Sequence, residues 1–371
     1  MKAWIGRNKY ELDTPCLVID LDILNENLLN MQQFAHAHGK ALRPHAKTHK
    51  CSIIARKQIE AGAVGICTAK ISEAEVLVNR GILGVLVTGP VVTRPKIECL
   101  MRCLEIDPSL MVVTDNPENA RVLDAACTDR GLSLKVLLDV DVGLGRTGVY
   151  PEGACELADR IAAFTSLRFQ GIQAYAGHVQ HMKKYDERCR ASQESMEKAA
   201  DVFRRLNRDG YGCTIFTGAG TGTYDIDVMI PELTDLQVGS YVVMDAEYMG
   251  IGSANSAERF TTFRPALTLL SAVISMNRKG FATIDAGLKT LYRDGAAPLV
   301  VKPHGLLYEW FGDEYGKISF TENRSALKLG DVIELVVSHC DPTINLFDKL
   351  YVTQKDVVVD IWEVDLRGKS Q

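Results

Sequence analysis

Short apolar segments alternate with amphipathic segments along most of this chain, and this alternation constrains the fold more than any other feature. Eight short apolar runs with strand character occupy residues 41–47, 64–68, 84–88, 110–114, 135–140, 169–174, 214–217 and 236–239. Helical patterns fill most gaps, at residues 72–80, 95–104, 117–130, 151–164 and 188–208. Continuous apolar strands between helices are typical of parallel strands buried on both faces. Because eight such strands close a barrel, we expect an α/β fold with a (β/α)8 TIM-type barrel. A doubly wound open sheet is the alternative, since the last two strands are weak.

The pattern changes on either side of this region. An apolar strand is expected at residues 16–20, followed by a helix at residues 22–38 with Asp22 as its N-cap and Gly39 as its stop. Beyond residue 260 the chain has strand-like segments at 266–276, 281–285, 332–337 and 356–362, with almost no helical signal. We therefore expect a barrel domain over residues 18–260, and a smaller β-rich domain made of residues 1–17 and 261–371.

Composition limits the classes of partner. The 371 residues are 46% hydrophobic and 24% charged, which is typical of a globular protein with a large core. A net charge of −5 argues against nucleic acid or a membrane surface as a partner. The N-terminus lacks a signal-peptide pattern and no apolar run is long enough to span a membrane. Ten cysteines without CxxC pairs indicate neither a disulfide framework nor a zinc knuckle, so a reducing, cytoplasmic compartment is expected.

Basic side chains recur at every second position near the end of the first predicted barrel strand. Arg43, His45, Lys47 and His49 alternate along this segment, so an extended chain places them on one face. A solvated edge would explain them without any function. In a barrel interior, however, they predict an anion-lined cavity in which one lysine has a lowered pKa and a nucleophilic amine.

Three further clusters follow predicted strands five, six and seven. They occupy residues 141–148, 175–181 and the glycine-rich turn 217–223. Barrel enzymes build their active sites at these carboxyl ends, where Lys47 also lies. The glycines of the turn leave backbone N–H groups accessible to a phosphate, although such a turn is often only a turn. It has neither Walker A nor Rossmann spacing.

The β-rich region contains one pair of candidate metal ligands. His339 and Asp341 are two residues apart after an apolar strand, and in an extended chain they would point the same way and could share one cation. An isolated His-x-Asp pair is more often a hydrogen-bonded turn, so this pattern alone does not establish a metal site.

Together these residues resemble the D-threonine aldolase and D-serine dehydratase family, which are fold type III pyridoxal-phosphate enzymes related to the alanine racemase N-terminal domain. The resemblance spans nearly the whole chain in the order of the family. It rests on residues 13–15, 43–50, 72–74, 145–146, Tyr175, 180–181, 218–223, 237–241, 244–245, 285–289 and 339–343. The chain departs from the expected family pattern at Ala69, Ala176, His178 and Tyr315.

The resemblance implies a site built around pyridoxal 5′-phosphate and a divalent cation. Lys47 would bind the cofactor covalently and Arg146 would face its pyridine nitrogen. His45 and Tyr175 would lie beside the cofactor. The phosphate would be bound near Gly218, Gly220, Thr221, Gly222 and Tyr241. The cation would be held by His339 and Asp341.

The resemblance also implies a reaction: retro-aldol cleavage of a D-3-hydroxy amino acid, such as D-threonine or 3-hydroxy-D-aspartate, to glycine and an aldehyde. Lys47, His181 and Tyr175 would be catalytic, with His181 removing the β-hydroxyl proton. Since Asp341 stands where dehydratases have cysteine, a hard cation (Mn²⁺ or Mg²⁺ rather than Zn²⁺) and the aldolase branch are favoured. The alternatives are a D-serine or 3-hydroxyaspartate dehydratase and a non-catalytic cofactor-homeostasis protein. A homodimer is also implied.

Overall fold

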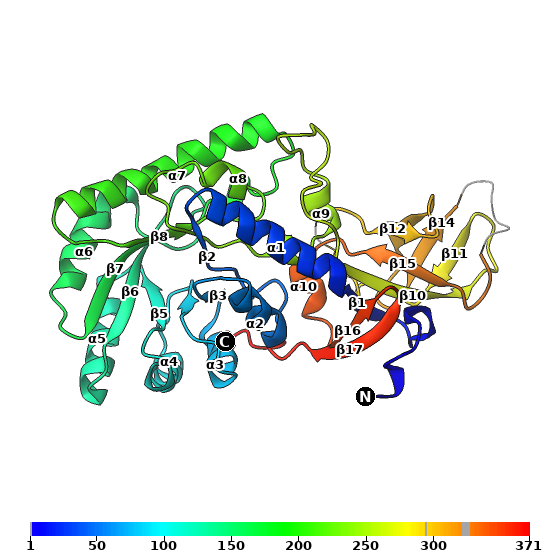
Figure 1. Ribbon diagram of the computed structural model, residues 1–371, viewed down its shortest axis with the longest axis horizontal. Helices are drawn as coiled ribbons and strands as arrows, with labels where there is room; N and C mark the ends of the chain where they lie inside the picture. Colours follow the sequence, from blue (N-terminus) through cyan, green and yellow to red (C-terminus); the bar gives the residue numbers. More distant parts are fainter. Residues whose placement is uncertain (1, 294, 321–326) are drawn as a thin grey trace. The chain divides into compact units, whose positions relative to one another are not determined.

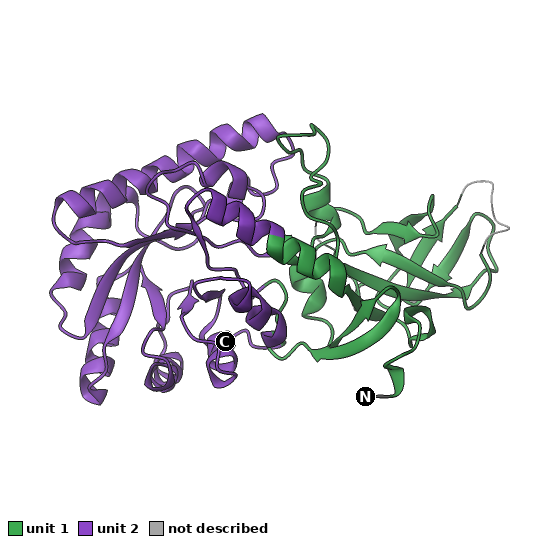
Figure 2. Ribbon diagram, in the orientation of Figure 1, with its two compact units in different colours: residues 1–29, 48–51, 240–367 green, residues 30–47, 52–239, 368–371 purple. Residues whose placement is uncertain are grey.

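The computed structural model describes residues 2–293, 295–320 and 327–371. The chain forms two compact units, each assembled from several segments (Figure 2). We call residues 30–47, 52–239 and 368–371 the barrel unit, and residues 1–29, 48–51 and 240–367 the β-rich unit. No helix in the described residues is both long enough and apolar enough to cross a membrane.

The barrel unit is built on a sheet of eight parallel strands (Figure 1). Its strands are β2 (Ala41–Leu42), β3 (Ile66–Thr68), β4 (Val85–Val87), β5 (Met111–Thr114), β6 (Leu134–Val140), β7 (Leu167–Ala174), β8 (Ile215–Gly218) and β9 (Asp235–Leu236). They follow the order β2-β9-β8-β7-β6-β5-β4-β3. The sheet closes after β2, where His45 forms a parallel bridge with Cys67 of β3. All eight predicted strands are confirmed, and closure excludes the open sheet.

Helices cover the outside of this barrel, as expected for strands that are buried on both faces (Figure 1). They are α2 (Ser52–Glu60), α3 (Ile71–Asn79), α4 (Arg94–Ile106), α5 (Pro117–Arg130), α6 (Ala154–Ala162), α7 (Tyr185–Arg208) and α8 (Tyr224–Asp227). Inside, Cys67, Leu86, Met111, Val113 and Leu137 pack as one buried cluster. The predicted helices therefore agree with the observed ones to within a few residues.

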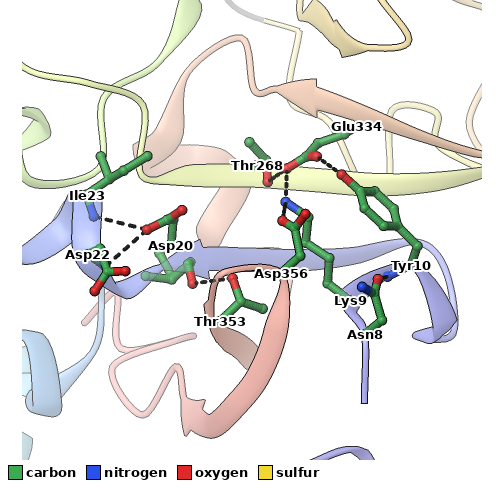
Figure 3. A network of polar contacts seen from close by, with 11 residues as sticks. Asn8, Lys9, Tyr10, Asp20, Asp22, Ile23, Thr268, Glu334, Thr353 and Asp356 are labelled. Carbon is green, nitrogen blue, oxygen red and sulfur yellow. Dashed lines mark hydrogen bonds and ion pairs between the residues drawn. The ribbon is translucent and has the colours of Figure 1, made fainter. Parts of the chain in front are cut away.

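The helix α1 (Leu21–Ala37) begins one residue earlier than expected, and Asp22 is not its N-cap. The carboxylate of Asp20 instead accepts hydrogen bonds from the N–H groups of Asp22 and Ile23, both at 3.0 Å (Figure 3). Asp20 ends the preceding strand, so its carboxylate is placed ahead of the first helical turn, where the unpaired N–H groups point.

The β-rich unit contains a nine-stranded sheet in the order β11-β14-β13-β12-β15-β10-β1-β16-β17. These strands are β1 (Cys16–Asp20), β10 (Leu267–Ser275), β11 (Phe281–Ile284), β12 (Leu299–Lys302), β13 (Leu307–Trp310), β14 (Gly316–Ser319), β15 (Val332–Val336), β16 (Lys349–Gln354) and β17 (Val357–Glu363). Since β11 also pairs with β10, the strands between them close into a small barrel. The four strands predicted beyond residue 260 are confirmed, whereas β12, β13, β14 and β16 were not predicted.

The boundaries between the two units differ from the predicted division at residues 17/18 and 260/261. Strand β1 pairs with β10 and β16, so the N-terminal segment belongs to the β-rich unit as far as residue 29. The second boundary falls at residue 240, directly after the last barrel strand. The sequence does not reveal β1 as part of the distant sheet, because its apolar pattern fits either unit.

A buried polar network fixes the N-terminal segment to the β-rich sheet (Figure 3). The Lys9 ammonium lies 2.8 Å from Glu334 and 2.9 Å from Asp356. Glu334 also accepts hydrogen bonds from the Tyr10 hydroxyl, at 2.7 Å, and from the Thr268 hydroxyl, at 2.8 Å. The buried charge of Lys9 is thus neutralised by two carboxylates, as a buried cation requires.

Candidate active site

Lys47 follows β2 at the carboxyl end of the barrel strands and is half-buried. Its backbone N–H donates to Nδ1 of His45 at 3.4 Å. Nε2 of His45 lies 3.1 Å from the hydroxyl of Thr88, which itself donates to the carbonyl of Thr68 at 3.0 Å. Because the hydroxyl proton of Thr88 is used in this way, His45 donates through Nε2, and the neutral tautomer satisfies both contacts. The ring of His45 therefore links the backbone N–H of Lys47 to the hydroxyl of Thr88.

Arg43 and His49, at the two ends of this basic segment, are both buried. Strand β2 ends at Leu42, but pairing with neighbouring strands extends to His45, whose N–H donates to the carbonyl of Val238 at 3.0 Å. Arg43 is buried, with its Nε 3.3 Å from a carboxylate oxygen of Asp235. His49 is fully buried and accepts the N–H of Cys51 through Nδ1 at 3.2 Å. Alternation fails beyond His45 because residues 46–49 form a turn, and Arg43 is neutralised by Asp235 inside the barrel.

The turn after β6 carries Arg146. The carboxylate of Asp141 accepts the N–H of Gly143 at 2.9 Å and the N–H of Gly145 at 3.1 Å, which folds the turn. Partial burial raises the pKa of Asp141, but these backbone N–H groups outweigh it and leave the pKa below its ordinary value. Arg146 is exposed, and its guanidinium carbon lies 5.9 Å from the centre of the Tyr175 ring. The sequence-predicted pair of Arg146 and Tyr175 is thus brought together.

The segment after β7 carries two histidines with different surroundings. Tyr175 is followed by the short 3-10 helix η4 (Gly177–Val179), which contains His178. His178 is exposed, and its Nε2 lies 3.3 Å from the hydroxyl of Ser195. His181 is half-buried just beyond this helix. Both histidines come from the same strand end as Tyr175, as predicted.

The glycine-rich turn after β8 packs tightly against Gln180. A Cβ on Gly218 would lie 2.3 Å from the carbonyl oxygen of Ala174. On Gly220 it would lie 2.4 Å from Oε1 of Gln180, and on Gly222 it would lie 2.1 Å from the Gln180 carbonyl oxygen. The three glycines are therefore required by close packing. The turn also contains buried Thr221 and a left-handed residue at position 219, with φ of +67°. Left-handed residues are components of the backbone nests that bind anions, and position 219 supplies one such residue to this turn.

A buried network supports this turn from behind. The carboxylate of Asp227 accepts the hydroxyls of Ser192 and Thr223, both at 2.6 Å. The fully buried Arg188 donates from Nε to the carbonyl of Gly222 at 2.7 Å. Burial raises the pKa of Asp227 from its ordinary 3.8 to about 6, although both hydroxyl hydrogen bonds lower it. This network could not be predicted from the sequence, because Arg188, Ser192 and Asp227 lie on helices and form no motif along the chain.

The remaining predicted site residues belong to the β-rich unit. Tyr241 lies in the 3-10 helix η5 (Ser240–Val242), is buried, and packs edge-on against Phe263 with ring centres 5.6 Å apart. His339 precedes the helix α10 (Cys340–Ile344), and Asp341 lies in its first turn. The expected extended conformation of this segment is therefore wrong. The two side chains nevertheless converge, with Nε2 of His339 3.9 Å from Oδ2 of Asp341.

This His339–Asp341 pair fits a hard divalent cation. The separation of the two atoms is compatible with two ligand bonds of roughly 2.1 Å each to one ion. The hydroxyl of Ser240 lies 3.4 Å from the same Asp341 oxygen. Among the described residues, no group of three or more His, Cys, Asp or Glu side chains is arranged to hold one ion. A site with two protein ligands leaves positions for water or substrate, as Mg²⁺ and Mn²⁺ sites often do.

Two family models match successive parts of the chain. Residues 19–247 match the alanine racemase N-terminal domain. Residues 266–353 match the serine dehydratase domain. The first match covers all eight barrel strands, with Lys47, Arg146, Tyr175 and His181. The second covers the His339–Asp341 pair.

Relatives span the whole chain. A D-threonine aldolase of Arthrobacter sp is 37% identical over 97% of this chain and 94% of its own length. A 3-hydroxy-D-aspartate aldolase of Paracoccus denitrificans is 35% identical over 98% of this chain and 95% of its own length. The crystal structure of a D-threonine aldolase from Filomicrobium marinum has a TM-score of 0.94 and 36% identity, covering 100% and 99% of the two chains. These similarities include the β-rich unit, and the chain therefore belongs to the alanine racemase N-terminal-domain family and, within it, to the D-threonine aldolase-like carbon–carbon lyases.

Proposed function

We propose that this protein cleaves the Cα–Cβ bond of a D-3-hydroxy amino acid, such as D-threonine or 3-hydroxy-D-aspartate, to give glycine and an aldehyde. The observation that carries this proposal is the convergence of His339 and Asp341, a nitrogen and a carboxylate oxygen 3.9 Å apart. A hard cation at this pair would lower the pKa of a β-hydroxyl, and an aldol cleavage requires that hydroxyl to lose its proton.

Pyridoxal 5′-phosphate would supply the sink for the electrons of the broken bond. Lys47 would hold this cofactor covalently, since it is half-buried at the strand ends with its backbone anchored by His45. Arg146 and Tyr175, which lie near one another after neighbouring strands, would contact the cofactor ring. The turn containing Gly218, Gly220, Thr221 and Gly222, together with Tyr241, would bind the phosphate.

His181 would take the proton from the β-hydroxyl. The breaking Cα–Cβ bond then leaves its electron pair at Cα, the β-carbon becomes the aldehyde, and protonation at Cα yields glycine. General-base catalysis of this kind requires a side chain that gains and loses a proton near neutral pH, which histidine provides. The half-buried position of His181 beyond Tyr175 supports this assignment over the exposed His178.

We further propose a native cation, an oligomeric state and a cellular compartment for this protein. The cation would be Mn²⁺ or Mg²⁺ in preference to Zn²⁺, because Asp341 supplies a hard oxygen ligand. The protein would act as a homodimer on a small-molecule substrate. All ten cysteines lie in described residues and none is in a disulfide, which supports a reducing, cytoplasmic compartment as its place of action.

The match of residues 266–353 to the serine dehydratase domain favours one alternative, elimination of water from D-serine or 3-hydroxyaspartate. One experiment separates the two reactions: incubation of the holoenzyme with D-threonine, D-serine and 3-hydroxy-D-aspartate, with and without EDTA. Glycine and an aldehyde, lost on chelation and restored by Mn²⁺, would support the aldolase. Ammonia and a keto acid as the products would overturn it.

A further inference from the structure

Glu247 faces the ring nitrogen of His339 that Asp341 does not face. Its Oε2 lies 3.8 Å from Nδ1 of His339, whereas Oδ2 of Asp341 lies 3.9 Å from Nε2. All three side chains are largely buried, with between 14% and 18% of their surface exposed. The two carboxylates thus lie beside different ring nitrogens of one imidazole.

Backbone hydrogen bonds place Glu247 at this position. It lies in the helix α9 (Ala246–Met249). The first residues of α9 form backbone hydrogen bonds with the residues between β15 and His339. The N–H of Ala246 donates to the carbonyl of Val337 at 3.0 Å, and the N–H of Glu247 donates to the carbonyl of Ser338 at 3.1 Å. Glu247 is therefore hydrogen-bonded to the residue that precedes His339.

The buried carboxylate of Asp245 joins the same two elements. It accepts the N–H of Tyr248 at 3.0 Å, which caps α9, and the N–H of Cys340 at 2.9 Å, at the start of α10. One fully buried side chain thus ties together the first turns of the helices that carry Glu247 and Asp341. Asp245 therefore fixes the backbone from which the Glu247 and Asp341 side chains extend.

Gly295 closes the space behind Glu247. A Cβ at this position would lie between 2.6 and 2.8 Å from the carboxylate atoms of Glu247. A larger residue here would require the Glu247 carboxylate to move. The carboxylate is therefore confined between the backbone at Gly295 and the imidazole of His339.

We propose that Glu247 is a positioning residue for the cation site: its carboxylate, 3.8 Å from Nδ1 of His339, favours the tautomer with the proton on that nitrogen and so leaves the Nε2 lone pair for the ion shared with Asp341. A carboxylate on the second nitrogen of a ligating histidine fixes the tautomer and the ring orientation and increases ligand basicity. We do not assign Glu247 as a ligand of the cation, because it lies beside Nδ1 of His339, whereas Asp341 lies beside Nε2. This inference rests on the proposed cation site.

The test measures Mn²⁺ binding to holoenzyme that has been stripped of metal. Free Mn²⁺ is followed by electron paramagnetic resonance, so the readout does not depend on turnover. Glu247→Gln is expected to weaken Mn²⁺ binding roughly 10- to 100-fold. The melting temperature measured in EDTA should remain that of the wild type, since the change removes a charge without removing volume.

Two matched pairs control this experiment. Glu309→Gln makes the same chemical change on β13, where the exposed Glu309 binds Lys317 and Ser319, and should leave Mn²⁺ affinity unchanged. Gly295→Ala should weaken Mn²⁺ binding by displacing the Glu247 carboxylate. Gly305→Ala imposes a similar left-handed strain, with φ of +83° against +72° at Gly295, but its Cβ would contact no other atom. It should leave Mn²⁺ binding unchanged.

Asp341→Ala separates the two levels of the proposal. If the wild type binds Mn²⁺ no better than Asp341→Ala, the proposed cation site itself is wrong. If Asp341→Ala loses binding but Glu247→Gln binds like the wild type, only the positioning role is overturned. A Glu247→Gln variant that loses Mn²⁺ as completely as Asp341→Ala would instead make Glu247 a ligand and would also overturn the inference.

Discussion

The amide nitrogen of Gln180 lies 3.0 Å from the hydroxyl oxygen of Thr223, and the amide oxygen of Gln180 accepts the N–H of Gly222 at 3.0 Å. One buried side chain, just beyond the helix η4, thus holds the turn that follows β8 at two points. The same Thr223 hydroxyl donates to Asp227 at 2.6 Å. The proposed phosphate turn is therefore supported by a continuous buried network.

We predict that Gln180→Ala lowers affinity for pyridoxal 5′-phosphate about tenfold. Losing the amide leaves the buried N–H of Gly222 without its acceptor, which costs about 1–3 kcal/mol and loosens the turn. Equilibrium dialysis of the cofactor measures the effect. Gln170→Ala, in a half-buried glutamine of β7 outside this network, is the matched control. Equal cofactor affinity in both variants would show that the Gln180 contacts do not order the turn.

Asp227 should make stability depend on pH. Burial raises its pKa to about 6 in the folded protein, so the folded state binds a proton more tightly than the unfolded state does. The unfolding free energy should therefore fall as pH rises from about 4 to about 6, by up to about 3 kcal/mol. Asp227→Asn cannot titrate and lacks this contribution. Urea unfolding of both proteins at pH 5 and pH 7 measures the difference, and parallel pH profiles would contradict it.

Sequence patterns predicted what depends on local periodicity and missed what depends on distant pairing. The eight barrel strands and the β7 and β8 clusters follow from apolar runs and strand ends, which are local features. Strand β1 pairs with partners about 250 and 330 residues away, and no local pattern encodes that. Likewise, Asp235 is the acidic residue that neutralises Arg43, yet it lies on the last barrel strand. Tertiary contacts of this kind decide which charged residues are structural and which can serve a site.

We predict that Lys47→Ala abolishes the visible absorbance of the lysine-bound cofactor. Lys47 is half-buried and follows the first barrel strand closely, whereas Lys289 is exposed and paired with Glu314. Lys289→Ala should therefore keep the absorbance and serves as the control. Borohydride reduction followed by peptide mapping identifies the modified residue directly. Finding the cofactor on Lys50 or Lys289 would overturn the assignment.

His181→Ala should slow cleavage while cofactor and substrate still bind. Removing a general base typically lowers the rate on the order of 10²–10⁴-fold, and His181 is proposed to act only on the β-hydroxyl proton. Exchange of the substrate amine with Lys47 needs no such base, so the spectral change on adding D-threonine should persist while aldehyde forms slowly. Stopped-flow absorbance and an aldehyde assay measure the two events separately.

His178→Ala is the matched control for this prediction, because it removes an imidazole from the same strand end. His178 is exposed and lies 3.3 Å from the hydroxyl of Ser195, a contact that helix α7 provides and that needs no substrate. Its loss should change the rate little. If His178→Ala is inactive and His181→Ala turns over normally, the two roles must be exchanged. If both variants cleave the substrate at the normal rate, neither histidine is the base, and another group must accept the β-hydroxyl proton.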